Sequence, residues 1–302
     1  MESRSAPAAS ANATLIGVSA ILMWATLALL TRLSGPIPPF QLTGICFTLA
    51  FLIGVGLWVR QGQAPWVRLR LPWQVWLVGV SGLFGYHFFY FLALQNAPTV
   101  EASLIAYLWP LLIVLFSALL PGETLRWFHG AGAIAGFAGA ILLISDGAAL
   151  SFRPEYGFGY GCAVACAVIW SGYSILSRRF GEIPIDAVGA FCGVAAVLSW
   201  LCHGLLESFV MPTGQQALAI VGLGLGPVGA AFFTWDYGVK RGNIKMLGVL
   251  SYGAPLLSTL LLVGAGMATA SWWLALACGL IVGGAALAMG DILRGGGGRS
   301  PS

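Results

Sequence analysis

Two stretches, ILMWATLALLTR at residues 21–32 and AVIWSGYSILSR at residues 167–178, carry the same pattern of side chains. Trp24 and Trp170 stand at the same place in these apolar runs, and each stretch ends in a hydroxyl residue followed by an arginine. Apolar runs of this kind form membrane helices, in which a central indole N–H needs a polar partner. The sequence therefore predicts a duplicated helical unit.

The correspondence continues along the chain at a nearly constant offset. The matching segments are GPIPPFQLTGIC (35–46) with GEIPIDAVGAFC (181–192), GYHFFY (85–90) with GAAFFT (229–234), and YLWPLL (107–112) with YGAPLL (252–257). The second half is a degenerate copy of the first. We expect one repeat at residues 13–145 and the other at residues 156–290.

The composition places the chain in a membrane. The chain is 59% hydrophobic and only 8% charged, whereas about 25% of residues are charged in soluble domains. Apolar runs of about 20 residues are long enough to cross a ~30 Å hydrocarbon core as helices. Ten such runs lie near residues 13–33, 38–59, 73–95, 99–120, 126–145, 156–178, 184–206, 215–238, 244–265 and 270–290. They predict an all-α polytopic protein of the lipid bilayer with ten transmembrane helices.

The basic residues predict the orientation of these helices. Each copy holds five helices, and an odd number makes the two copies cross the bilayer in opposite directions. With the amino terminus inside, all of the 14 Lys and Arg residues except Arg32 and Arg153 fall on cytoplasmic segments. This bias follows the positive-inside rule. We therefore expect two inverted five-helix repeats with both termini in the cytoplasm.

The charged residues and cysteines argue against several other classes of protein. The orientation explains the net charge of +4, so we expect no nucleic-acid partner. Cys162 and Cys166 share a helix face, but no second ligand pair supports a metal site. We expect no cofactor and no phosphate-binding loop. Asp236 and Lys240, four residues apart near a helix end, are expected to form a surface ion pair.

An inverted repeat has a functional consequence. Two similar halves in opposite orientation can exchange conformations around a central site, which opens first to one side and then to the other. That is the arrangement of secondary transporters. A duplicated structural bundle without transport is one alternative, and a membrane enzyme, which would need clustered catalytic side chains, is another. Glycines four residues apart in the fifth and tenth runs leave the oligomeric state open.

The twelve tryptophans fall into two groups. Nine, with Trp58 and Trp235 among them, lie at or near helix ends, where the interfacial belt accounts for most of them. Trp24, Trp109 and Trp170 lie near the centres of the first, fourth and sixth runs. These three either pack in the core or line a wet cavity, and both interpretations stay open.

The third run carries a group of aromatic side chains on one face. Tyr86, His87 and Tyr90 fall within about one third of the helix circumference. The aligned residues of the second repeat are alanine or threonine, and Trp109 also aligns with an alanine. A cavity with such an aromatic wall would suit a flat, bulky, partly polar solute. His87 either donates to a neighbouring backbone carbonyl as a neutral ring or binds the carboxylate of the solute.

Two prolines interrupt the fourth and ninth runs. Pro110 and Pro255 each remove a backbone donor and free the carbonyl four residues earlier, which for Pro255 belongs to Ser251. Such carbonyls could accept from an ammonium group, and the breaks could also act as hinges. Tyr107, Ser251 and Tyr252 lie beside these breaks and complete the predicted set of substrate-binding residues.

The order of these features resembles the drug/metabolite transporter superfamily with two EamA-type repeats. The shared features are five plus five helices, the tryptophans of the first and sixth runs, the prolines of the fourth and ninth, and LLPGE (119–123) closing the fourth. The second repeat departs from the pattern, because GAGMATA (264–270) stands where Gly-Glu would be.

Within the superfamily, the aromatic first half is most similar to the bacterial aromatic amino acid exporters. The resemblance implies a multi-pass transporter of the inner membrane that exports amino acids by alternating access, with Pro110 and Pro255 as hinges. Export of another small metabolite or drug is the alternative. Coupling to protons through His87, exchange and downhill export all remain open.

Overall fold

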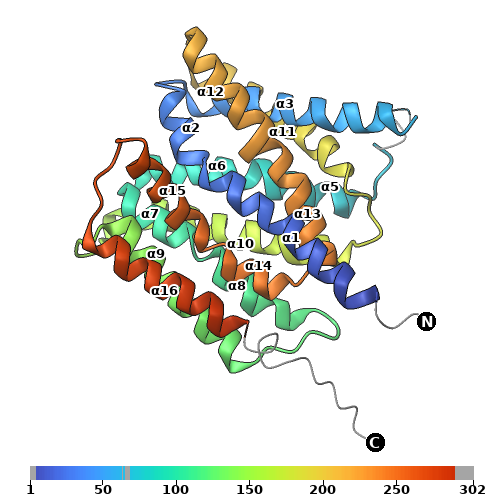
Figure 1. Cartoon of the computed structure of the whole chain (residues 1–302). Coiled ribbons are helices and arrows are strands. Elements are labelled where there is room, and N and C mark those ends of the chain that lie inside the picture. The colour runs from blue at the N-terminus through green and yellow to red at the C-terminus, as the bar shows by residue number, and fades with distance from the viewer. Residues whose placement is uncertain (1–4, 63, 65–68, 290–302) are drawn as a thin grey trace, which may run out of the picture.

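The fold is a bundle of helices, given by a computed structural model that describes residues 5–62, 64 and 69–289 (Figure 1). Nine helical spans in this described part are long and apolar enough to cross a membrane, and Trp272–Ala288 forms a shorter tenth. The prediction of ten transmembrane helices in an all-α protein is thereby confirmed.

Several of the ten spans consist of two or more helical elements. The elements are α1 (Ser5–Ala25), α2 (Leu27–Leu33), α3 (Pro39–Arg60), α5 (Trp73–Val80), η1 (Ser81–Gly85), α6 (Tyr86–Asn96), α7 (Thr99–Ala106), α8 (Trp109–Phe116), η2 (Ser117–Leu119), α9 (Trp127–Ser145), η3 (Pro154–Tyr156), α10 (Gly157–Arg179), α11 (Ala187–Leu206), α12 (Gly214–Leu225), η4 (Gly226–Ala230), α13 (Ala231–Arg241), α14 (Ile244–Leu250), α15 (Gly253–Gly264) and α16 (Trp272–Ala288).

Proline and polar caps set the beginnings of many helices. Pro38, Pro72 and Pro98 are the residues that precede α3, α5 and α7. Proline suits such positions because its fixed φ is compatible with the start of a helix and its missing N–H is not needed there. At α12, Thr213 and Gln216 form a reciprocal capping box. The sequence thus marks the ends of the apolar runs with local signals.

Corresponding helices of the two repeats pack against each other in opposite directions. A Cβ on Gly54 of α3 would meet the backbone of Gly189 in α11, whereas Gly44 lies against Trp200, so the two helices are antiparallel. Helices α9 and α16 lie side by side in the same way (Figure 1). Small residues permit these close backbone approaches in membrane bundles. Both pairs show the inverted relationship that two five-helix units require.

The remaining contacts between the halves also come in equivalent pairs. Helix α1 packs on α13, and its counterpart α10 packs on α6. The third and eighth spans each contain a π-helical turn, η1 and η4, at matching places. The fourth and ninth spans each break just before their proline, between α7 and α8 and between α14 and α15. The duplication seen in the sequence is therefore present in the irregularities of the helices too.

The bundle has two chemically different ends. We name end A the end at which Asn243 contacts Thr14 of α1, and end B the end at which Arg32 contacts Met267. Among the described Lys and Arg residues, only Arg32 and Arg153 lie at end B. Four basic residues of the orientation argument lie outside the described part of the chain, namely Arg4, Arg68, Arg294 and Arg299.

Two expectations about surface residues are wrong. Trp58 and Trp235 are completely buried and do not belong to an interfacial belt. The ion pair between Asp236 and Lys240 is also buried: their side chains are 1% and 4% exposed, and Lys240 Nζ lies 2.7 Å from Asp236 Oδ2. The reason is common to both regions, because close packing of α3 on α11 and of α13 on α1 and α10 covers these helix ends.

Candidate functional site

Four tryptophans converge at the centre of the bundle. We call Trp24, Trp109, Trp170 and Trp235 the tryptophan cluster. Their ring centroids are 5.0 Å apart for Trp24 and Trp235, and 5.7 to 6.3 Å apart for the other five pairs. Edge and offset contacts of this kind contribute ~0.5–1.5 kcal/mol each beyond their buried area. The cluster joins the first, fourth, sixth and eighth spans, and so takes side chains from both repeats.

The four indole N–H groups differ in their partners. Trp24 donates to the carbonyl of Pro227 at 3.0 Å, and Trp235 donates to the Ser174 hydroxyl at 3.0 Å. Within the part of the chain that the structure describes, no hydrogen-bond partner is found for Nε1 of Trp109 or Trp170, and the two residues are 5% and 4% exposed. Buried polar groups normally have partners. These two donors are therefore candidates for a hydrogen bond to a solute.

The aromatic face of α6 borders the tryptophan cluster. Tyr86 lies 5.8 Å from Trp170 between ring centroids and stacks on Tyr90 at 6.0 Å. His87 contacts the rings of Phe47 at 5.2 Å and Phe232 at 6.4 Å. The structure thus brings together three separate predictions: the central tryptophans, the aromatic third span and the histidine.

His87 is held by the π turn that precedes α6. Its Nδ1 lies 2.7 Å from the carbonyl oxygen of Leu83, and because a carbonyl can only accept, Nδ1 carries the hydrogen. This contact is the one expected for a neutral histidine in a membrane span, and it leaves Nε2 as an acceptor. Trp24 satisfies a carbonyl of the second π turn in the same manner. Each π turn therefore orients one polar aromatic side chain of the site.

The residues beside the prolines are placed in two different surroundings. Tyr107 contacts Trp109 at 6.3 Å between ring centroids and belongs to the edge of the central site. Tyr252 is completely buried in a separate cluster with Ala140, where its hydroxyl accepts from the Leu111 N–H at 3.1 Å. The structure therefore does not place Tyr252 on the tryptophan cluster.

Ser251 is also engaged within its own helix. Its hydroxyl donates to the carbonyl of Leu247 at 2.7 Å, and its own carbonyl accepts from the Ala254 N–H at 3.1 Å. The chain breaks at this point, three or four residues before Pro255, and at the equivalent point before Pro110. Helix breaks at these positions are the geometry that a hinge needs.

Sequence reasoning missed three aromatic residues of the site. Phe47, Phe232 and Trp235 are buried against the residues named above: Phe47 stacks on Phe232 at 6.0 Å, and Phe232 lies 5.7 Å from Trp170. The aromatic wall is therefore not confined to the first repeat. A signal was present in the sequence, because Phe232 and Trp235 are three residues apart and share a helix face.

An ion network closes the bundle at end A. Arg178 donates to Glu123 at 2.9 Å and to the carbonyls of Val239 and Gly242 at 3.0 and 2.6 Å. Lys245 lies 2.9 Å from the other oxygen of Glu123. The network ties the loop after the fourth span to the end of α10 and to the connection between α13 and α14. It explains why an arginine ends the sixth run.

The central site combines large ring surfaces with few polar groups. This chemistry can hold a flat apolar body and orient it by a small number of hydrogen bonds. The polar atoms of these side chains are the indole Nε1 atoms of Trp109 and Trp170 and the ring nitrogens of His87, of which Nδ1 is bonded to the carbonyl of Leu83. Within the described residues, no group of three His, Cys, Asp or Glu side chains is arranged to hold a metal ion.

The fold defines a class: polytopic helical membrane proteins built from two inverted five-helix repeats. The chain belongs to the EamA-like transporter family, whose model matches residues 12–145 and 157–290.

Two relatives and a solved structure are similar over most of the chain. A protein of Ancylobacter novellus named aromatic amino acid exporter YddG is 58% identical over 278 residues, which are 92% of this chain and 96% of that protein. The protein of the same name from Salmonella typhimurium is 26% identical over 266 residues, 83% of this chain and 88% of its own. A crystal structure at 56% identity superimposes with a TM-score of 0.90 and covers 94% of this chain and 98% of that one.

Proposed function

We propose that this protein is a secondary transporter that exports aromatic amino acids by alternating access. The observation that carries the proposal is the tryptophan cluster, which takes side chains from both repeats and brings Trp109 and Trp170 within 6.3 Å of each other between ring centroids. The names of the two relatives point to the same solute class. The proposal also covers amino acids with other neutral side chains, provided that their carboxylate and ammonium groups make the same contacts.

The proposal places the protein in a bacterial inner membrane with end A in the cytoplasm. Positively charged residues prefer the cytoplasmic side of membrane proteins, and the described basic residues are concentrated at end A. The two units at residues 13–145 and 156–290 would then move against each other. The helix breaks before Pro110 and Pro255 are the hinges on which that movement turns.

In the proposed complex, the aromatic ring of the solute lies among Trp24, Trp109, Trp170 and Tyr86. Ring contacts supply most of the affinity, since each contributes ~0.5–1.5 kcal/mol. The free indole N–H groups donate to the solute carboxylate, and Nε2 of His87 accepts from its ammonium group. Tyr90 and Tyr107 extend the same wall, which leaves room for side chains of different size.

Transport in reconstituted vesicles tests this function. We expect the purified protein to take up L-phenylalanine or L-tryptophan, and we expect Trp109→Ala and His87→Ala to lower that uptake at least fivefold while elution and thermal melting stay unchanged. Trp127→Ala is the matched control, because Trp127 is 73% exposed at a helix end. Unchanged uptake in both site variants would remove the site assignment, and no uptake by the unmodified protein would remove the function.

A further inference from the structure

Trp235 is the most enclosed ring of the tryptophan cluster. Its side chain is completely buried. Its ring centroid lies 5.0 Å from that of Trp24, 5.8 Å from that of Trp109 and 6.2 Å from that of Trp170. A ring without exposed surface is not reached by a solute. Trp235 therefore lies behind the other three rings and supports them.

The indole N–H of Trp235 is held by Ser174 of α10. The Ser174 hydroxyl accepts from Nε1 of Trp235 at 3.0 Å and donates to the carbonyl of Trp170, four residues earlier, at 2.9 Å. Because an indole N–H can only donate and a carbonyl can only accept, the roles of both groups are fixed. Ser174 is completely buried, so water does not compete for either bond. One hydroxyl thus connects α13 to the turn of α10 that carries Trp170.

The adjacent residues, Tyr173 of α10 and Asp236 of α13, form a second and weaker connection. Tyr173 stacks on Trp170 with 5.2 Å between ring centroids, and its hydroxyl donates to Asp236 at 3.3 Å. This distance exceeds the usual range for an O–H···O hydrogen bond, whereas both bonds of Ser174 lie within the ranges for their types. Asp236 also takes part in a buried ion pair. Ser174 therefore provides the firmer of the two connections.

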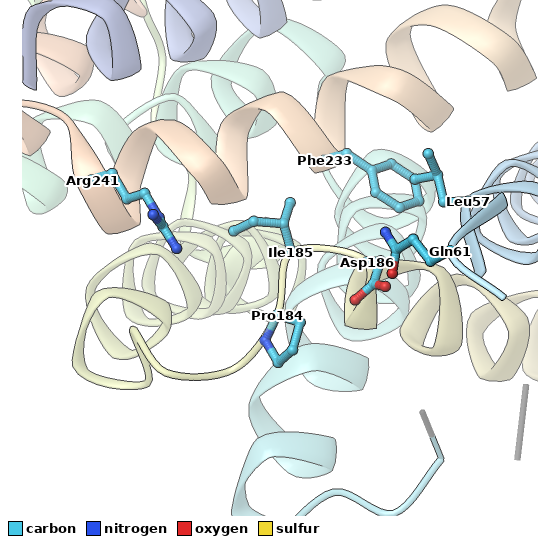
Figure 2. A pocket seen from close by; sticks show the side chains of 7 residues that line it. All are labelled: Leu57, Gln61, Pro184, Ile185, Asp186, Phe233 and Arg241. Carbon is cyan, nitrogen blue, oxygen red and sulfur yellow. The ribbon is translucent and has the colours of Figure 1, made fainter. Parts of the chain in front are cut away.

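The opposite side of α13 borders a cavity. The cavity has a volume of about 330 Å³, and Figure 2 shows Phe233 and Arg241 of α13 in its lining. Phe233 and Trp235 are two residues apart, so their side chains point about 200° away from each other. Because the packing around α13 is incomplete on the side of the cavity, the bond to Ser174 contributes more to fixing the position of Trp235.

The first repeat has neither partner of this hydrogen bond. Ser174 aligns with Ala28, and Trp235 aligns with Phe91. The side chains of alanine and phenylalanine have no polar atom. The duplicated fold therefore forms without such a bond at the equivalent place. The bond is not a requirement of the fold, and it belongs to the central site that the second repeat helps to build.

We infer that Ser174 is a positioning residue of the transport site: it fixes Trp235, which in turn fixes the rings of the other three tryptophans around an aromatic solute. This inference rests on the proposed function. A site whose rings are held before the solute arrives loses less free energy on binding. Ser174 therefore sets the affinity of the site for aromatic amino acids without contacting them.

Uptake of L-tryptophan by vesicles that contain the Ser174→Ala variant tests the inference. The change leaves the buried N–H of Trp235 without its acceptor, so the ring reorients to find another partner. We expect the KM for L-tryptophan to rise about threefold to tenfold, with a maximal rate that stays within twofold. A merely structural role would lower the amount of folded protein and hence the maximal rate, but it would leave the KM unchanged.

Ser171→Ala is the matched control. Ser171 lies on the same helix and is equally buried, and its hydroxyl donates to the carbonyl of Ala167 at 2.7 Å. The control thus removes a buried hydroxyl whose bond stays within its own helix. We expect the KM for L-tryptophan to be unchanged in this variant. An equal rise of the KM in both serine variants would show a general effect on α10 and would overturn the inference.

A double-mutant cycle separates the bond to Trp235 from any other effect of Ser174. Trp235→Phe keeps an aromatic ring but has no N–H donor, so adding Ser174→Ala to it should change the KM by less than twofold. The two single changes then share one cause. If their effects on the KM multiply instead, Ser174 acts independently of Trp235, and the inference is wrong.

The remaining outcomes distinguish this inference from the proposed function. A lower maximal rate with an unchanged KM in Ser174→Ala would make Ser174 a structural residue and remove the inference alone. Normal uptake with both constants unchanged would do the same. If the unmodified protein took up no aromatic amino acid, the proposed function would fail, and the inference would fail with it.

Discussion

Nη2 of Arg178 lies 2.9 Å from Oε1 of Glu123, and this pairing is not repeated by the equivalent arginine of the first repeat. Arg32, which aligns with Arg178 in the first repeat, donates instead to the backbone carbonyl of Met267 at 3.0 Å. Hydrogen bonds between two charged groups are stronger than bonds from a charged donor to a neutral carbonyl. The two aligned arginines of this duplicated fold therefore make bonds of unequal strength.

Neutralising Glu123 should loosen end A. We expect Glu123→Gln to raise hydrogen–deuterium exchange in the segments 120–127 and 239–245 about fivefold, because a partly exposed ion pair is worth up to ~1 kcal/mol. Glu155→Gln is the control, since its pair with Arg153 is 61–62% exposed. Exchange that stays at the level of the unmodified protein would show that Glu123 does not hold this end.

The hydroxyl of Tyr252 should support the broken fourth span. Tyr252→Phe leaves the buried N–H of Leu111 without its acceptor, at a cost of ~1–3 kcal/mol. We expect a lower melting temperature in detergent, with transport of L-phenylalanine retained by the protein that remains folded. Tyr107→Phe is the matched change in the first repeat and should melt like the unmodified protein. Equal melting of the two variants would contradict this account.

The glycine contact between α3 and α11 should tolerate no side chain. A Cβ at Gly54 would lie 2.6 Å from the Cα of Gly189, whereas a Cβ at Gly56 would meet nothing within 4 Å. Overpacking of this kind costs ~1–3 kcal/mol. Gly54→Ala should therefore lower the midpoint of thermal unfolding, and Gly56→Ala should leave it unchanged or raise it slightly. The two midpoints are compared by the fluorescence of the tryptophans.

Removing a hinge proline should slow transport without weakening binding. Pro110→Ala restores a backbone donor in the fourth span, so we expect the span to straighten. The maximal rate of L-phenylalanine uptake should fall several-fold, and its equilibrium binding should stay within twofold. A loss of binding equal to the loss of rate would instead place Pro110 in the support of the central site.

The duplication made most of the architecture predictable. Ten helices in two inverted units are predicted by the paired tryptophans, the paired prolines and the odd number of runs in each copy. The antiparallel packing of α3 on α11 at Gly54 and Gly189 agrees with this prediction. Periodicity also placed Tyr86, His87 and Tyr90 on one face, because neighbours on a helix surface follow from spacing alone.

What the sequence did not reveal depends on contacts between distant segments. Trp235 and the Asp236–Lys240 pair lie near the end of an apolar run, and a position near a helix end normally means exposure to the interface. Their burial comes from α10, whose Ser174 receives the Trp235 N–H at 3.0 Å. Tyr252 was predicted to bind substrate because it lies close to Pro255 in the sequence. That proximity does not determine which helix its side chain contacts.

The number of residues in each of the two π turns determines the direction of the side chains that follow it. A π turn holds one more residue than an α-helical turn, and each residue rotates the following side chains by about 100°. Deleting a single residue between Ser81 and Gly85 would keep the third span helical and equally hydrophobic. It would nevertheless rotate Tyr86 and His87 away from Trp170 and Phe47, which they contact. Spacing, as much as residue identity, is thus what evolution has to preserve in this chain.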